Sequence, residues 1–196
     1  MPGIVTGACW VLVVAIWIAG AVRLRRAPSR RQPLDGGAIW RIGAVVVAVL
    51  VFGFAAPDLQ RITTHSWWVE CPGLVLIVGS TIFTLWARFS LGAMWSLSPN
   101  ALRDHHQLRT DGPYAVTRHP IYTGLLGMLL GTTLLNGVGV LISVPVVGVA
   151  AFAVRVSIEE RLLRQSFPDD YLRYGERVPQ LIPGLRLIGR PRRRGP

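Results

Sequence analysis

The sequence contains no lysine, although it has 21 basic residues against 10 acidic ones in 196 positions. All its basic residues are therefore arginine, which excludes a Schiff-base lysine and the lysine of a Walker-type phosphate loop. Charged residues make up only 16% of the chain and hydrophobic residues 51%, whereas about a quarter of an ordinary soluble domain is charged. The net charge of +11 therefore does not indicate a soluble nucleic-acid-binding face, and the apolar content excludes intrinsic disorder.

Cysteine and histidine are also scarce, with two and four residues respectively. Cys9 and Cys71 lie in apolar stretches without C-x-x-C spacing, so we predict that both are small packing residues. The sequence has no H-E-x-x-H motif, and we therefore predict no metal site.

Long apolar runs are abundant. Crossing a hydrocarbon core of about 30 Å takes about 20 helical residues. Three runs each predict one crossing: 4–22, 40–56, and 72–87 extended backwards to Val69. The run 121–154 is long enough for two short helices, so we predict a helical hairpin with its break at Asn136-Gly137; a re-entrant or single kinked helix is the alternative. The expected fold is an all-α integral membrane protein with about five transmembrane helices.

The first run has two interpretations. Ala19-Gly20-Ala21 resembles a signal-peptide cleavage site, but the basic cluster follows the run instead of preceding it, so we predict a retained helix.

The distribution of arginines predicts the orientation in the membrane. With five crossings, every arginine except Arg61 falls on the same side of the membrane. The positive-inside rule then places the N-terminus outside and the C-terminus in the cytoplasm. Since the all-arginine composition indicates a GC-rich bacterial genome, we expect the bacterial cell membrane.

We expect the chain to divide into two parts. Residues 1–90 would hold the first three helices, and residues 91–196 a cytoplasmic loop, the hairpin and a cytoplasmic tail. The tail begins as a helix at Arg155, Pro168 ends that helix, and later prolines predict an irregular remainder. The arginine-rich end is expected to be a solvated tail, with contact to anionic lipid head groups as the alternative.

One cluster of polar residues precedes the hairpin. His119-Pro120 predicts an extended residue followed by a helix with proline in its first turn. Arg118 and His119 would then lie beside free backbone N–H groups and the positive end of a helix dipole. This arrangement predicts an anion site for a carboxylate or a phosphate.

A second cluster follows the hairpin. Arg155 and Glu159 are four residues apart and share a helix face, and Glu160 is adjacent. The hairpin should bring these residues close to the first cluster, and residues 171–179 are expected to fold over both as a lid. Each residue alone is equally well explained as an interfacial ion pair or a helix-end residue. The whole set on one side of a hairpin favours a functional site, because ionisable groups at the membrane edge are costly without a role.

Three motifs carry a resemblance to a known family. They are G-P-Y-x-x-x-R-H-P-x-Y-x-G at 112–124, E-E-x-x-L at 159–163 and F-x-x-x-Y-x-x-Y-x-x-x-V-P at 167–179. Together they resemble the isoprenylcysteine carboxyl methyltransferase family and its bacterial relatives, which are membrane enzymes similar to phospholipid methyltransferases. The resemblance extends from about residue 91 to residue 183. It implies S-adenosyl-L-methionine as cofactor, bound on the cytoplasmic side between the last helices and the tail.

The resemblance also implies roles for individual residues. The expected cofactor-binding residues, including two tyrosines of the lid, are His106, Gln107, Leu108, Arg109, Tyr114, His119, Pro120, Ile121, Tyr122, Glu159, Tyr171 and Tyr174. Arg155 is implied to bind the substrate. We expect Arg118 and Arg177 to hold an anionic acceptor, and Glu160 to order an arginine or take a proton from a neutral nucleophile, so these three are the predicted catalytic residues. An upstream glutamine of the family has no counterpart in residues 94–103.

The chemistry of these residues suits that cofactor. Helix-end amides and His119 suit its carboxylate, Tyr114 or Tyr122 can face the sulfonium as a cation–π partner, and Glu159 can accept from ribose or adenine. Methyl transfer is an in-line displacement that depends on alignment and needs no covalent enzyme intermediate.

We therefore predict a membrane methyltransferase that takes S-adenosylmethionine from the cytoplasm and a lipophilic or small acceptor through the bilayer. A bacterial cell is not expected to make prenylated C-terminal cysteines. The acceptor thus stays open among a lipid, an isoprenoid and a thiol, with O-, N- or S-methylation. The alternatives are an NADPH-dependent membrane reductase of the sterol-reductase type and a non-catalytic membrane adaptor. No nucleic acid is expected as a partner.

Overall fold

The structure is a computed structural model that describes residues 2–26, 66–92, 108–137 and 142–183. All regular secondary structure in these ranges is helical, which agrees with the predicted all-α class. The helices are α1 (Pro2–Arg26), α3 (Trp67–Leu91), α4 (Pro113–Val116), α5 (Pro120–Leu135), α6 (Ser143–Ser166) and α7 (Pro168–Arg177).

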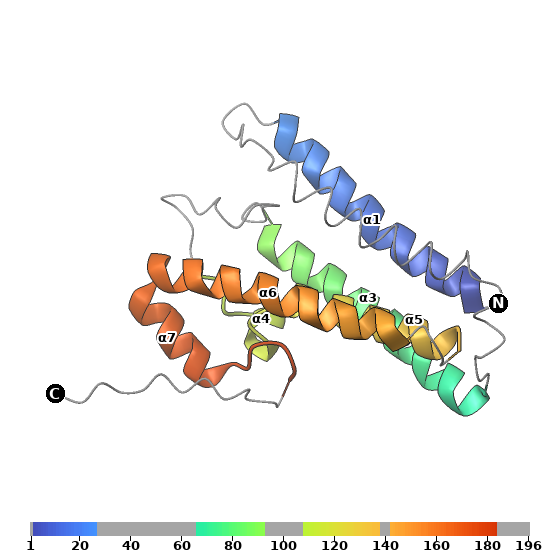
Figure 1. The fold of residues 1–196 in the computed structure, drawn as a ribbon. Helices are drawn as coiled ribbons and strands as arrows, with labels where there is room; N and C mark the ends of the chain where they lie inside the picture. The colour runs from blue at the N-terminus through green and yellow to red at the C-terminus, as the bar shows by residue number, and fades with distance from the viewer. Residues whose placement is uncertain (1, 27–65, 93–107, 138–141, 184–196) are drawn as a thin grey trace.

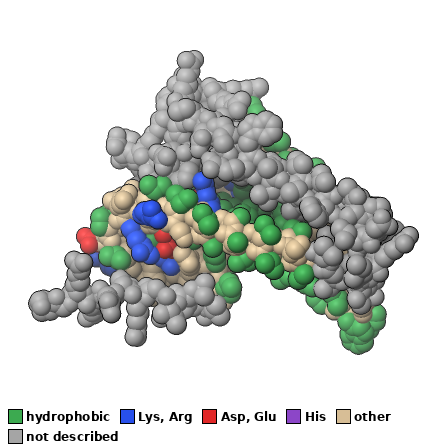
Figure 2. Space-filling model, viewed as in Figure 1, with side chains coloured by type: hydrophobic (Ala, Val, Ile, Leu, Met, Phe, Trp, Pro, Cys, Tyr) green, Lys and Arg blue, Asp and Glu red, His purple; other side chains and the backbone are tan. Residues whose placement is uncertain are grey.

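The long helices lie side by side, and the short helices α4 and α7 gather at one end of them (Figure 1). Helices α3 and α6 run toward this end, whereas α5 runs away from it. The ends of α3 and α6 and the start of α5 therefore meet there, and we call this region the α7 end. Figure 2 shows arginine and acidic side chains gathered at the α7 end, while hydrophobic side chains cover the opposite end of the described helices.

Helices α3 and α5 approach so closely that their backbones are in contact. A Cβ atom added to Gly131 would lie 2.7 Å from the backbone nitrogen of Ile77, and one added to Gly73 would lie 2.6 Å from that of Leu135. Gly127, by contrast, lies against the side chain of Ser80. Small residues permit such an approach between membrane helices. The glycines of the predicted hairpin therefore serve mainly to pack α5 against α3.

Helix α1 packs against the middle of α5. Trp10 and Val13 form an apolar core cluster with Met128 and Leu129, and Cys9 packs against this cluster as predicted. The Trp10 indole N–H donates a hydrogen bond to a threonine hydroxyl of α5 at 3.0 Å. The prediction that Cys71 is a packing residue is wrong, because it is exposed near the start of α3.

Two of the described helices are long and apolar enough to span a membrane: α1 over Pro2–Gly20, and α3. The predicted break at Asn136-Gly137 is confirmed, since α5 ends there and Gly137 has a φ of +101°, which favours glycine. Helix α5 is a shorter apolar helix, and α6 continues past Val154 to Ser166. The predicted crossing at 40–56 lies outside the described residues, so the count of five helices stays a prediction.

Pro168 ends α6 as predicted, but the expectation of an irregular chain after it is wrong for residues 168–177, which form α7. Pro168 occupies the first helical position, two aspartates lie in the first turn and Arg177 lies in the last turn. These positions suit the helix dipole. Tyr171 and Tyr174 are three residues apart and give the helix one buried face. Pro168 therefore ends α6 and begins α7.

Candidate active site

The segment that enters α5 is shaped by glycine and proline. Gly112 has a φ of +59°, which a side chain would strain, and Pro113 begins the single turn of α4. Pro120 begins α5 as predicted, and His119 is the N-cap residue. The His119 side chain makes no capping hydrogen bond. It is therefore available, with the neighbouring Arg118, to contact α6.

Glu160 of α6 binds two arginines. Its Oε1 lies 2.9 Å from Nη1 of Arg118, and its Oε2 lies 2.9 Å from Nη2 of Arg164. Burial alone would raise the pKa of Glu160, but its interaction with His119 and the positive charges around it outweigh burial and lower the pKa to about 2. A carboxylate this acidic is a poor general base at neutral pH. Of the two roles predicted for Glu160, the geometry favours holding Arg118 in place.

His119 lies between the two glutamates of α6. Its Nδ1 is 3.6 Å from Oε2 of Glu159, and its Nε2 is 3.6 Å from Oε1 of Glu160. Only 4% of the His119 side chain is exposed. Burial would lower the pKa of His119, but the two neighbouring carboxylates outweigh burial and raise it above the ordinary histidine value. His119 therefore keeps its positive charge to a higher pH than a free histidine does.

Glu159 links α6 to α5. Its Oε1 accepts a hydrogen bond of 2.6 Å from the Tyr122 hydroxyl and lies 3.3 Å from Nε of Arg155. The predicted shared face of Arg155 and Glu159 is thus confirmed. Burial would raise the pKa of Glu159, but its interactions with His119, Tyr122 and Arg155 outweigh burial and lower it. Glu159 is an ionised carboxylate with a quarter of its side chain, 25%, still exposed.

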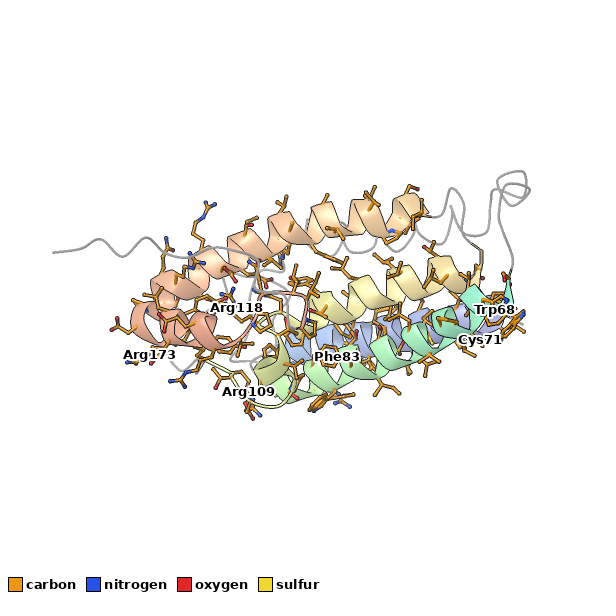
Figure 3. The ribbon with its side chains drawn as sticks, turned by 90° about the horizontal axis from the view of Figure 1, so that it is seen from below. Trp68, Cys71, Phe83, Arg109, Arg118 and Arg173 are labelled. Atoms are coloured by element: carbon orange, nitrogen blue, oxygen red, sulfur yellow. The ribbon has the colours of Figure 1, made fainter. Side chains whose placement is uncertain are left out.

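Helix α7 covers this cluster, as predicted for the lid. The Arg118 guanidinium carbon lies 5.7 Å from the centre of the Tyr171 ring, and the Tyr174 hydroxyl donates a 2.6 Å hydrogen bond to the Tyr114 carbonyl. A Cβ on Gly175 would lie 3.0 Å from Nη1 of Arg118, so glycine leaves room for the guanidinium. Figure 3 shows Arg118 between α6 and α7.

The segment after α7 crosses the start of α5, and we call its residues Pro179, Gln180 and Leu181 the strap. The backbone N–H groups of Arg118 and His119 donate to the carbonyls of Pro179 and Gln180 at 2.9 and 3.2 Å. The sequence predicted free backbone donors beside these two side chains. The amides of Arg118 and His119 themselves are not free, because the strap accepts from them, and free donors in the first turn of α5 stay a prediction.

The structure brings most of the predicted site residues together. The cluster contains Tyr114, Arg118, His119, Tyr122, Arg155, Glu159, Glu160, Tyr171 and Tyr174, with Pro120 and Ile121 in the adjoining first turn of α5.

Other predicted residues lie apart from the cluster. Arg109 pairs with the exposed Asp111 at 2.7 Å, and Leu108 precedes it in the loop. Arg177 is exposed in the last turn of α7 and makes no ion pair with another described residue. His106 and Gln107 lie outside the described residues.

Sequence reasoning missed some residues of the cluster. Arg164 follows Glu160 by four residues, a spacing that predicts an ion pair on one helix face and was available as a signal. Thr117 and Gln180 had no such signal, because the Thr117 hydroxyl bonds the backbone carbonyl of Gln180 across 63 positions of sequence. Bonds to a distant carbonyl leave no pattern in the sequence.

The surface beside Glu160 forms an open depression of about 420 Å³. It is lined by Ser157, Glu160, Arg161, Arg164, Gln165 and Gln180. The described residues contain no group of three or more His, Cys, Asp or Glu side chains that could hold a metal ion. Arg118, Arg155 and Arg164 surround the two carboxylates Glu159 and Glu160, so this region has an excess of positive charge and suits an anionic group.

Comparison with known proteins identifies related chains. The family model described as phospholipid methyltransferase matches residues 68–170. The chain is 34% identical over 143 residues to protein-S-isoprenylcysteine O-methyltransferase B of Arabidopsis thaliana, which covers 71% of this chain and 72% of that protein. It is 31% identical over 140 residues to the protein-S-isoprenylcysteine O-methyltransferase of Homo sapiens, covering 67% of this chain and 46% of the human protein. The chain thus spans about half the length of this human relative.

A solved structure has a similar fold. It is that of the eukaryotic intramembrane Ras methyltransferase ICMT, with a TM-score of 0.56 and 22% sequence identity. The match covers 81% of this chain and 56% of that one. At this identity the likeness concerns the fold alone, and it agrees with a helical bundle built for a membrane.

Proposed function

Since this chain is a methyltransferase that belongs to the isoprenylcysteine O-methyltransferase family, we propose that it takes its methyl group from S-adenosylmethionine and transfers it to a lipophilic or small acceptor. The single observation that carries this proposal is the cluster of Arg118, His119, Glu159 and Glu160, in which two ionised carboxylates meet His119 and the arginines 118 and 155 under α7.

The donor set fits this cofactor. Nε of Arg118 is a buried N–H donor without a hydrogen-bond partner among the described residues, and it suits the cofactor's carboxylate. Tyr114 and Tyr122 offer aromatic faces for a sulfonium cation. The partly exposed carboxylate of Glu159 suits a ribose hydroxyl or the adenine amine. When bound, the cofactor supplies an electrophilic methyl group.

The chain's own residues mainly bind and align. Glu160 and Arg164 hold Arg118, and Glu159 holds Tyr122 and Arg155, so each of these side chains has a fixed neighbour. Alignment alone accounts for a large part of the rate enhancement in such displacements, of the order of several kcal/mol. With Glu160 strongly acidic, an acceptor that is already an anion, such as a carboxylate, needs no base from this cluster.

The acceptor is the open part of the proposal. Arg155 lies on α6 between the apolar residues of the hairpin and Glu159, and we assign it to the acceptor. Arg177 is exposed and would contribute only with an acceptor that reaches the outer face of α7. The candidates are a lipid, an isoprenoid or a thiol, methylated on oxygen, nitrogen or sulfur.

We also propose a membrane orientation. The α7 end carries the arginines of α6 and α7, and the opposite end of α3 carries the exposed, stacked pair Trp67 and Trp68, with ring centres 3.7 Å apart (Figure 3). Arginine excess is typical of the cytoplasmic side, and tryptophan of the membrane interface. This supports an α7 end that faces the cytoplasm. Together with it we propose five crossings of a bacterial cell membrane, with the N-terminus outside and the C-terminus in the cytoplasm, and a methyltransferase core in residues 91–196.

Titration of the detergent-purified chain tests the function. The expected result is binding of S-adenosylhomocysteine and no binding of NADPH, and Glu159→Ala should weaken the former by well over tenfold. Binding of NADPH alone would support the reductase, and binding of neither would support the adaptor. Incorporation of radiolabelled methyl groups into lipid extracts then identifies the acceptor.

A further inference from the structure

Four hydrogen bonds fasten the strap to the start of α5. Two are the backbone bonds from Arg118 and His119. The other two come from side chains: the Thr117 hydroxyl donates to the Gln180 carbonyl at 2.8 Å, and the Thr123 hydroxyl donates to the Leu181 carbonyl at 2.5 Å. Thr117 is fully buried, so water cannot replace its bond.

The two threonines flank the residues that bear the charges of the cluster. Thr117 directly precedes Arg118, and Thr123 lies one turn into α5, where its hydroxyl also contacts the His119 carbonyl at 3.1 Å. The two hydroxyl oxygens are 3.5 Å apart. Threonine hydroxyls thus bind the strap on both sides of the Arg118-His119 pair in the sequence.

The strap in turn fixes the position of α7. It follows α7 after a single residue, Val178, whose N–H bonds the last turn of the helix. Gly175 and Tyr171 of α7 lie against the guanidinium of Arg118. The hydrogen bonds from Thr117 and Thr123 to the strap therefore hold α7 against Arg118.

We propose that Thr117 and Thr123 are positioning residues: their hydroxyls clamp the strap over the start of α5 and so hold Arg118 at Glu160 and His119 between the two glutamates. This deepens the proposed function, because it assumes that the cluster binds the cofactor. Neither threonine contacts the charged groups of the cluster through its own side chain. Both act through the strap and α7.

The test uses the full chain in detergent, with Thr117→Val and Thr123→Val separately and together. Valine keeps the shape of threonine and removes the hydroxyl. Thr117→Ser and Thr123→Ser keep the hydroxyl and serve as rescue variants. Thr81→Val is the matched control, since Thr81 is also buried, like Thr117, and its hydroxyl bonds only its own helix, to the Ile77 carbonyl at 2.7 Å. Two readouts are measured: the Kd of S-adenosylhomocysteine, and hydrogen exchange at the amides of Arg118 and His119.

The double valine variant should bind S-adenosylhomocysteine about tenfold more weakly, as expected from the loss of two hydrogen bonds. Its two amides should exchange faster. The serine variants should stay within about twofold of the wild type in both readouts, and so should Thr81→Val. Should the double variant not fold, Thr123→Val alone carries the comparison.

Two results would overturn the proposal. One is an unchanged Kd in a folded valine variant, which would reduce the threonines to a role in folding. The other is unchanged exchange at the two amides, which would show that the hydroxyls do not hold the strap. A wild-type chain that does not bind S-adenosylhomocysteine would refute the proposed function instead, and the exchange measurement would then decide on the strap alone.

Discussion

Nη1 of Arg118 lies 2.9 Å from Oε1 of Glu160, and both side chains are mostly buried, with 13% and 7% exposed. One residue comes from the loop before α5 and the other from the last third of α6. Their pairing joins the two halves of the helical hairpin at the α7 end. It also explains how a mostly buried arginine keeps its orientation beside His119.

Removing the carboxylate charge should be costly. Glu160→Gln leaves Arg118 without its buried partner, and breaking a buried ion pair typically destabilises a protein by about 3 kcal/mol or more. Thermal unfolding in detergent should show this loss, with weaker binding of S-adenosylhomocysteine. Combining Glu160→Gln with Arg118→Gln should cost less than the sum of the two changes. Strict additivity would show that the two side chains do not interact.

Gly175→Ala should separate stability from binding. Alanine is favoured over glycine in a helix by about 0.8–1 kcal/mol, so α7 itself should be at least as stable. The new Cβ, however, would lie 3.0 Å from Nη1 of Arg118, so the guanidinium has to shift by a few tenths of an ångström while keeping its pairing with Glu160. We expect an unchanged or raised unfolding temperature with several-fold weaker binding of S-adenosylhomocysteine. Binding at the wild-type level would show that Arg118 does not need its present position.

Gly131→Ala should destabilise the bundle. Its Cβ would lie 2.7 Å from the backbone nitrogen of Ile77, and such overpacking costs about 1–3 kcal/mol. Gly79→Ala is the matched control, because nothing lies within 4 Å of a Cβ at that position of α3. The unfolding temperature should fall for the first variant and not for the second. Equal effects would contradict the close packing of α3 on α5.

The charges of the cluster should make stability depend on pH. The pKa of His119 is raised in the folded chain, so its contribution is fully present below its ordinary value of 6.5 and is lost as the pH rises through the raised pKa. The contribution of Glu160 is present above 4.5 and is lost as the pH falls toward 2. Unfolding midpoints should thus fall more steeply above neutral pH in the wild type than in His119→Gln. Parallel curves would contradict the raised pKa.

Much of the fold follows from local rules in the sequence. Apolar length predicts α1 and α3, Asn136-Gly137 predicts the turn after α5, and proline at position 120 predicts where α5 begins. The spacing of four between Arg155 and Glu159 predicts their shared face. These features depend on neighbouring residues only, so one sequence suffices to find them.

The remaining features depend on partners distant in sequence. The strap bonds join residues near 120 to residues near 180, and the backbone contact of Gly131 is with α3, about fifty residues earlier. Helix α7 is absent from the prediction because Pro168 indicates the end of α6, although the spacing of Tyr171 and Tyr174 is visible in the sequence. The candidate site can be predicted largely because its motifs resemble a family. The hydrogen bonds between the strap and the start of α5 cannot be predicted in this way.

Photo-crosslinking tests the central claim most directly. The detergent-purified chain would be irradiated with ultraviolet light in the presence of methyl-labelled S-adenosylmethionine, with and without excess S-adenosylhomocysteine as competitor. The chain would then be digested and the labelled peptides mapped. We expect label that the competitor removes, in peptides that contain residues 114–122 or 155–160. Competed label confined to α1 or to the far end of α3, or no competed label at all, would contradict a cofactor site formed by Arg118, His119, Glu159 and Glu160.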